Sequence, residues 1–192
     1  MKRRGVTLIE TLIATAIAAL ASSALLLSVE SSLSTATDAV DRTIADGLAQ
    51  QLLDEIAQKR YVEPGVSATS STFGLDGSEA SLPGRSGYDD SDDFVSYSTA
   101  PLQGLYGETL GTGDDSGSLR LDSFRLSSTY FARWRRTVSV YYVDAATLQR
   151  LASGTSSFRC IEVTVEQRDA TNSYVPLATK RRVIAYVPPT SS

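Results

Sequence analysis

The distribution of hydrophobic and polar positions changes three times along the chain, and its first stretch is almost purely apolar. Residues 11–29 carry no charge, so 19 consecutive uncharged residues separate Glu10 from Glu30. As an α-helix they would span about 28 Å, close to the roughly 30 Å hydrocarbon core of a bilayer. Basic residues at positions 2–4 precede this stretch and favour a cytoplasmic location for that end. The pattern predicts one membrane-anchoring helix near the N-terminus.

The apolar stretch passes without a break into an amphipathic one. Its apolar positions recur every three or four residues, with charged residues between them, which is the period of one helix face. These positions are Leu33, Ala36, Val40, Ile44, Leu48, Leu52 and Ile56. No proline occurs before Pro64, and Gly47 alone weakens the run, by about 1 kcal/mol relative to alanine. We expect one continuous helix with a membrane segment at 6–29 and an amphipathic segment at 30–63.

The middle of the chain, residues 64–129, is too polar to build a core of its own. Glycine, serine and aspartate account for 28 of the 54 residues from 65 to 118. Loops of this length are either functional or partly disordered. We expect a loop-rich variable region here.

Residues 130–192 change to an alternating pattern typical of half-buried strands. The expected inward residues are Trp134, Val138, Val140 and Tyr142 in the first strand, Ile161, Val163 and Val165 in the second, and Val183, Ala185 and Val187 in the third. Residues 169–173 suggest the turn joining the last two strands, and residues 144–156 a longer loop. The sequence therefore predicts an α+β fold, in which the amphipathic helix covers an antiparallel sheet of three or four strands.

Charge and composition exclude several classes of function. The net charge of −4 argues against a nucleic-acid partner, which would need a concentrated basic face. The arginine groups at 133–136 and at 181–182 are interpreted as solvated strand edges. Because the chain has no histidine, Ser-His-Asp and Cys-His catalysis and His-containing zinc sites are excluded. The single Cys160 cannot form an internal disulfide and is interpreted as a half-buried strand residue.

One acidic cluster in the loop-rich region is a candidate metal site. Asp89, Asp90, Asp92 and Asp93 lie within five residues of one another, and carboxylates so close repel unless they are solvated or bound to a cation. Ca²⁺ takes six to eight oxygen ligands, so it is the candidate ion, although the spacing does not match an EF-hand loop. A solvated acidic loop is the alternative. No other cofactor is expected.

The start of the chain carries the most specific signal. Gly5 is followed by Val6-Thr7-Leu8-Ile9-Glu10 and then by the apolar helix. A carboxylate near the start of a membrane helix is costly to bury, so Glu10 is either functional or reaches the headgroups. This arrangement of a basic leader, a glycine, a hydrophobic helix and a glutamate closely resembles the prepilin leader of type IV pilins and type II secretion pseudopilins. The resemblance covers residues 1–30, with a weaker echo to about residue 60.

The resemblance implies processing and assembly. A prepilin peptidase would cut after Gly5, removing the leader 1–5, and would methylate Val6, which replaces the usual phenylalanine. Glu10 would be the assembly carboxylate. The partners would be other pilin or pseudopilin subunits and an inner-membrane assembly platform. The protein would be a single-pass inner-membrane protein with its C-terminal domain outside the cytoplasm, and a periplasmic or surface filament after assembly. In this family residues 6–29 also form the filament core.

The role of Glu10 also has a physical rationale. When subunits stack with an axial offset, the Glu10 carboxylate of one can neutralise the Val6 amine of another, and an unpaired charge in that apolar bundle would cost several kcal/mol. Small residues Ala14, Ala18 and Ser22 lie on one helical stripe and would allow neighbouring helices to approach closely.

Three alternatives remain open on the sequence alone. The triplet ending at Ala21 is compatible with a secretory signal peptide cut after that residue. A single-pass anchored binding or adhesion domain could carry the same leader. An anchored enzyme is disfavoured, because the predicted strands carry no polar constellation.

Overall fold

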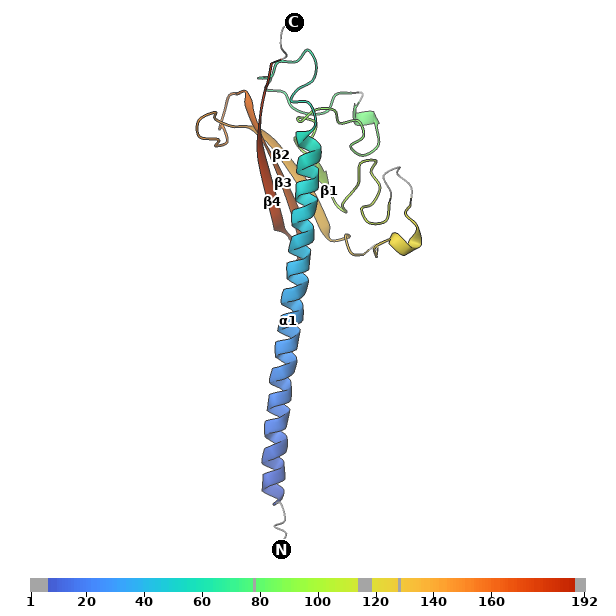
Figure 1. Cartoon of the computed structure of the whole chain (residues 1–192), viewed down its shortest axis with the longest axis vertical. Helices are drawn as coiled ribbons and strands as arrows, with labels where there is room; N and C mark the ends of the chain where they lie inside the picture. The colour runs from blue at the N-terminus through green and yellow to red at the C-terminus, as the bar shows by residue number, and fades with distance from the viewer. Residues whose placement is uncertain (1–6, 78, 114–118, 128, 189–192) are drawn as a thin grey trace. The chain divides into compact units, whose positions relative to one another are not determined.

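The computed structural model describes residues 7–77, 79–113, 119–127 and 129–188 (Figure 1). The described residues form one α-helix, two short 3₁₀ helices and four strands. They are α1 (Leu8–Ala57), η1 (Glu79–Ser81), β1 (Ser98–Thr99), η2 (Asp122–Phe124), β2 (Trp134–Tyr142), β3 (Phe158–Arg168) and β4 (Tyr174–Ala185). The chain divides into two compact units, Met1–Thr43 and Ile44–Ser192, and α1 contributes to both.

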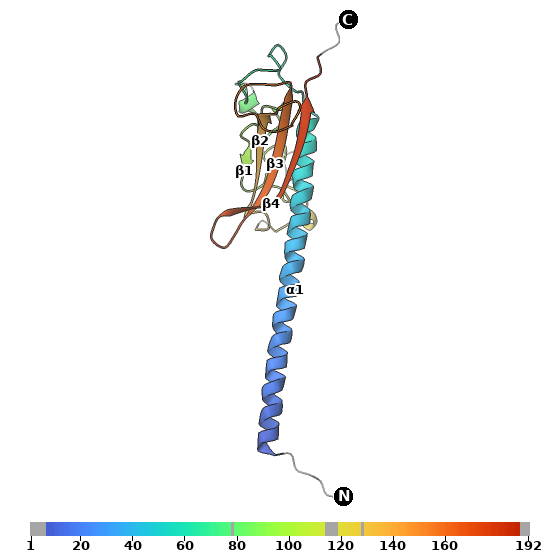
Figure 2. The same cartoon turned by 90° about the vertical axis from the view of Figure 1, so that its left-hand side faces the viewer.

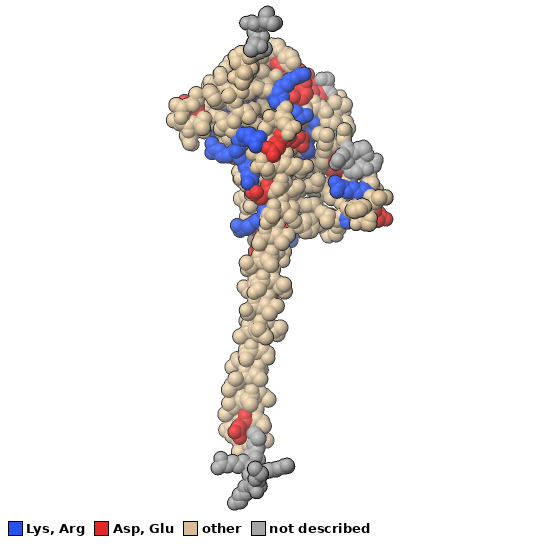
Figure 3. Space-filling model, viewed as in Figure 1, with Lys and Arg blue, Asp and Glu red and all other residues tan. Residues whose placement is uncertain are grey.

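The predicted continuous helix is confirmed, since α1 runs for 50 residues without interruption. Within the described chain it is the one helix long and apolar enough to cross a membrane, with a mean hydropathy of 2.2 in its most apolar window. None of that window is buried within the structure. Figure 3 shows a nearly uncharged surface along this part of α1, whereas charged side chains gather over the second unit.

The second unit contains a four-stranded antiparallel sheet in the order β1-β2-β3-β4, as predicted (Figure 2). Strands β2 and β3 pair from Trp134↔Gln167 to Tyr142↔Arg159. The tight turn between β3 and β4 lies where the sequence predicts it, with the Asp169 N–H donating to the Ser173 carbonyl. The two-residue strand β1 comes from the loop-rich region, and only its pairing with β2 makes it recognisable.

One face of the sheet and the last turns of α1 form most of the core of the second unit, to which the loops add Phe94, Leu102 and Phe131. The helix contributes small and aliphatic residues, namely Ala45, Ala49, Leu52, Leu53 and Ile56, all of them buried. The sheet contributes Trp134, Val138, Val140, Ile161, Val163 and Val165. The two alanines carry no side chain beyond Cβ, which lets this part of the helix approach the sheet closely. The sequence therefore predicted the inward face of β2 and β3 correctly.

The predicted inward face of the last strand is wrong. Ile184 packs against the core, whereas Ala185 and Val187 are exposed. The residues of β4 that share the face of Ile184 include Lys180 and Arg182, by their pairing with Val163 and Ile161. Each forms a 2.8 Å ion pair with an aspartate of α1, Lys180 with Asp46 and Arg182 with Asp54. Edge strand β4 therefore meets the acidic flank of the helix rather than its apolar stripe.

Two further expectations about single residues are also corrected. Arg136 does not lie on a solvated edge: only 2% of it is exposed, because it shares the inward face with Trp134 and Val138. Cys160 is fully buried rather than half-buried, although it points to the opposite face of the sheet, next to Tyr141 and Val183. In both cases the strand was predicted correctly and the surroundings of the side chain were not.

Candidate functional site

The start of α1 places Glu10 in the first helical turn, exposed and one turn after Thr7. The Thr7 backbone N–H donates to Glu10 Oε2 at 3.4 Å, and the Glu10 N–H donates to the Thr7 carbonyl at 3.0 Å. A glutamate at the third helical position that accepts the backbone N–H of the residue before the helix, here Thr7, is half of a capping box. The structure thus gives Glu10 a local role that sequence reasoning missed, although Thr7-Leu8-Ile9-Glu10 fits the T-x-x-E signature. Gly5 and Val6 lie outside the described residues.

The small-residue stripe Ala14, Ala18 and Ser22 is exposed along α1. The Ser22 hydroxyl donates to the Ala18 carbonyl at 2.8 Å, so its polarity is satisfied within the helix. Other hydroxyls of the apolar segment do the same, for example Thr11 to the Leu8 carbonyl and Thr15 to the Leu12 carbonyl. With these groups satisfied, the surface of the segment is suited to lipid or to another helix.

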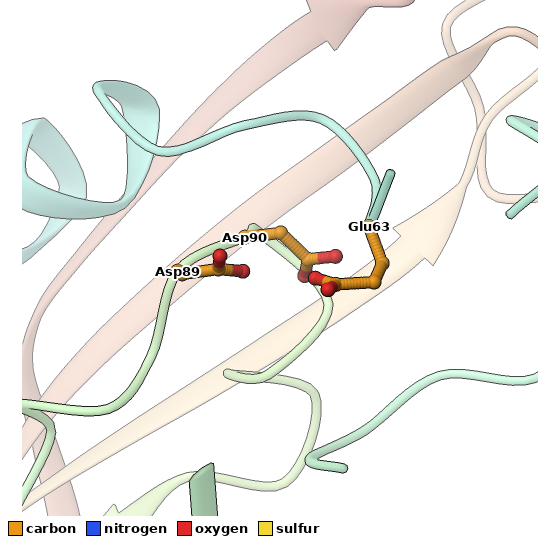
Figure 4. Close-up of side chains that lie close together, drawn as sticks. All are labelled: Glu63, Asp89 and Asp90. Atoms are coloured by element: carbon orange, nitrogen blue, oxygen red, sulfur yellow. The ribbon is translucent and has the colours of Figure 1, made fainter. Parts of the chain in front are cut away.

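The acidic loop forms a second candidate site, within the unit Ile44–Ser192. Carboxylate oxygens of Glu63, Asp89 and Asp90 lie within 4.8 Å of one another and point toward a common point (Figure 4). A second group of the same kind consists of Glu79, Asp89 and Asp93. Asp89 belongs to both groups, so the structure brings three of the four predicted aspartates into one cluster.

Asp92 is directed elsewhere. Its carboxylate forms a 2.7 Å ion pair with the fully buried Arg159 of β3. Asp90 and Asp93 also stabilise the conformation of the loop, because their carboxylates accept hydrogen bonds from its backbone. Asp90 Oδ1 accepts the Asp92 N–H at 2.8 Å, and Asp93 Oδ2 accepts the N–H groups of Asp89 and Asp90 at 2.9 and 3.1 Å.

The cluster has an excess of negative charge. A cavity of about 190 Å³ is lined by Glu63, Asp76, Glu79, Asp90, Asp92 and Asp93, together with small and polar residues. Arg60 pairs with Asp89 at 3.0 Å, but no described Lys or Arg lies within ion-pair distance of Asp90. Burial, reinforced by the neighbouring Asp92, raises the pKa of Asp90 to about 7. Burial also raises the pKa of Glu79 to about 7. Both shifts have the direction expected where burial and neighbouring carboxylates disfavour the charged form.

Glu63 and Glu79 were missed by sequence reasoning. Each lies ten or more residues from the aspartate run, in a stretch where the sequence predicted no helix, strand or repeat that would fix its position. The Asp76 and Glu79 pair does carry a recognisable signal. The Asp76 N–H donates to Glu79 and the Glu79 N–H donates to Asp76, which is the reciprocal pattern of a helix start, here at η1.

Comparison with known families agrees with the N-terminal signal. Residues 1–26 match the prokaryotic N-terminal methylation motif, which is characteristic of type IV pilins and pseudopilins. The long N-terminal helix and the four-stranded antiparallel sheet have the pilin-like layout. The motif therefore supports the resemblance inferred from the sequence, that to a pilin-like or pseudopilin protein processed by prepilin peptidase. Searches of the curated proteins and of the solved structures found no match.

Proposed function

We propose that this protein is a structural subunit, a minor pilin or pseudopilin, of a type II secretion pseudopilus or a type IV pilus. The observation that carries the proposal is the methylation motif at residues 1–26, which includes the apolar start of α1 and the single carboxylate of its first turn, Glu10. The motif points to a structural protein rather than an enzyme. The second unit, Ile44–Ser192, is then the part of the subunit that is presented outside the membrane.

Each step of the proposed assembly depends on a different feature at the start of α1. Prepilin peptidase cuts after Gly5 and methylates Val6, and the apolar segment anchors the subunit in the membrane. The assembly platform then transfers the subunit into a bundle of like helices, where the exposed apolar surface of α1 becomes buried. Glu10 neutralises the terminal amine of a neighbouring subunit, and the stripe Ala14, Ala18 and Ser22 allows close helix packing. A wrong register leaves a charge unpaired in an apolar environment.

Processing gives the first test. The chain isolated from its native host is expected to begin at N-methylated Val6, as read by N-terminal mass analysis. Gly5→Leu should leave uncut precursor in the membrane, because the bulky side chain occupies the position before the cut. The matched control is Ala21→Leu, which alters the cleavage site of the alternative signal peptide. Uncut precursor in Ala21→Leu, or a mature chain that begins at Ser22, would contradict the proposal.

The acidic cluster supports a second, separate proposal: it binds Ca²⁺. Two overlapping carboxylate groups share Asp89, and the buried Asp90 has no cationic partner among the described residues. Oxygen ligands from Glu63, Glu79, Asp89, Asp90 and Asp93 suit a hard cation of flexible coordination geometry. The ion would offset the burial and the neighbouring charge that raise the pKa of Asp90. Asp92 contributes indirectly, since its ion pair with Arg159 ties the loop to the sheet.

Calcium binding predicts a rise in melting temperature. Addition of millimolar CaCl₂ to the detergent-solubilised full chain should raise the melting temperature by about 3–6 °C at ten times the dissociation constant, because the ion binds the folded state preferentially. The fluorescence of Trp134, the single and fully buried tryptophan, reports the transition. Asp90→Asn should reduce the shift. Asp122→Asn, which makes the same charge change at a side chain that is 88% exposed, should leave it intact. No shift in the unmodified chain would favour the solvated-loop alternative.

A further inference from the structure

A cavity in the second unit has no part in the assembly scheme above. Its volume is about 690 Å³, within the range of small-ligand sites. The end of α1 and the turn after it form one wall, through Glu55 and Lys59, and the loop at 103–113 forms another. Arg85, Arg120 and Arg136 also line it. The cavity is therefore bordered by four cationic side chains and, besides Glu55, by one further carboxylate, Glu108.

Both carboxylates already have partners. Glu55 forms a bidentate pair with Arg85, in which Arg85 Nε and Nη2 each donate at 2.9 Å. The remaining Arg85 nitrogen donates to the Tyr97 hydroxyl and to the Gln103 and Gly104 carbonyls. Glu108 folds back on its own loop and accepts the Tyr106 N–H at 2.9 Å. Neither carboxylate forms an ion pair with Arg136.

Arg136 is the anomaly of this cavity. Only 2% of it is exposed, and no described carboxylate lies within ion-pair distance. Its partners are the Gln103 carbonyl at 3.0 Å and the Leu48 carbonyl at 3.5 Å, and its Nε has no partner. Burial, reinforced by the nearby Arg85, lowers the pKa of Arg136 from its ordinary value, although Tyr97 and Glu55 act in the opposite direction. A buried cation without a direct ion-pair partner is costly.

A buried cation of this kind has two physical explanations, and they predict opposite effects of removing it. In the first, Arg136 has a purely structural role and connects α1 to the loop at 103–113 through its hydrogen bonds to the Leu48 and Gln103 carbonyls. In the second, Arg136 is the binding group for an anion, and the protein is less stable without the anion than with it. The second explanation agrees better with the contacts, because two carbonyl bonds offset only part of the cost of a buried guanidinium, and the side chain faces a cavity large enough for a ligand.

We propose that this cavity binds a small oxyanion, a phosphate or a carboxylate, through the guanidinium of Arg136, with Arg120 at the exposed mouth. Guanidinium groups present paired N–H donors that match the spacing of phosphate and carboxylate oxygens. Lys59 adds positive charge, although its ammonium group also donates to the Tyr88 carbonyl at 2.6 Å. The site is independent of filament assembly, because every lining residue lies within Ile44–Ser192.

The test is a melting experiment on the detergent-solubilised full chain, followed by the fluorescence of Trp134. Inorganic phosphate and succinate are added separately, each against chloride at the same ionic strength. At ten times its dissociation constant, a bound anion should raise the melting temperature by about 3–6 °C. The anion that gives the larger shift identifies the preferred chemistry. If neither anion shifts the transition, the proposal is overturned.

Three variants separate the two explanations. Arg136→Met keeps the length of the side chain and removes its charge, so it should leave the melting temperature in chloride unchanged or higher and abolish the shift. Arg120→Gln, at an exposed position, should fold normally and reduce the shift. Arg181→Gln, outside the cavity, should retain the full shift. A melting temperature of Arg136→Met that falls by several degrees in chloride, with the shift retained in Arg120→Gln, would give Arg136 a purely structural role and overturn the proposal.

Discussion

Replacement of Arg159 by leucine is expected to lower the free energy of unfolding of the unit Ile44–Ser192 by about 3–5 kcal/mol. Arg159 has no exposed surface, and its guanidinium forms a 2.7 Å ion pair with Asp92, which is itself 8% exposed. Removal of one partner leaves the other as a buried, uncompensated charge. That penalty, rather than the lost attraction alone, makes the effect large.

Aromatic rings add to the effect. The Arg159 guanidinium lies 4.3 Å from the ring centroid of Tyr61, 4.7 Å from that of Phe73 and 5.3 Å from that of Tyr142. Cation–π contacts of a desolvated cation contribute up to about 2 kcal/mol. Tyr61 and Phe73 belong to the chain that follows α1, and Asp92 belongs to the acidic loop. Arg159 therefore connects two long loops to β3, and its loss should loosen the acidic cluster as well.

The melting temperature measures this prediction. A loss of 3–5 kcal/mol corresponds to a fall of about 10 °C for a unit of this size. Arg181→Leu, on the exposed face of neighbouring β4, is the matched control and should change the melting temperature by less than about 2 °C. The double replacement of Arg159 and Asp92 by leucine should recover part of the loss, because no charge is then left unpaired. A single variant that melts like the control would contradict the buried ion-pair argument.

The parts of the fold that the sequence predicted well are those governed by one strong period. The helix has an unbroken apolar stripe and no proline, and β2 and β3 alternate cleanly, so their inward faces could be predicted from Val138 or Val163 alone. In β4 the polar residues that face α1 form ion pairs with it, so hydrophobic alternation pointed to the wrong face. An ion pair such as Arg182–Asp54 joins residues 128 positions apart, and no local pattern records it.

The candidate sites depend even more on tertiary structure. The four aspartates at 89–93 were recognisable as a cluster in the sequence. In the structure Asp92 pairs with Arg159 instead, and Glu63 and Glu79 belong to the cluster although they are distant in sequence. Arg136 was interpreted as solvated because it is charged, although its position two residues after Trp134 places it on the inward face. A charged residue that alternates in register with buried strand residues indicates a buried charge. The sequence did contain this signal.

The charge and the capping roles of Glu10 are separated by two substitutions. Glu10→Gln preserves an oxygen that can accept the Thr7 N–H but removes the charge, whereas Glu10→Ala removes both. If the carboxylate neutralises a neighbour's terminal amine, both variants should be lost from filaments. An unpaired amine in an apolar bundle costs several kcal/mol, and about 3 kcal/mol already corresponds to a more than hundredfold loss of incorporation.

Both variants are expected to insert in the membrane, because each removes a charge from an apolar helix. The unit Ile44–Ser192 should keep its melting temperature, since its core contains no residue from this part of α1. Membrane fractionation and filament shearing on the same cells measure insertion and incorporation together. Normal incorporation of Glu10→Gln with loss of Glu10→Ala would assign Glu10 to helix capping alone. Normal incorporation of both would make Glu10 an interfacial residue, and the absence of any sheared filament from the unmodified protein would favour a membrane-anchored binding or adhesion domain. Loss of membrane insertion would contradict the charge-pair argument directly, because that argument gives Glu10 no part in targeting.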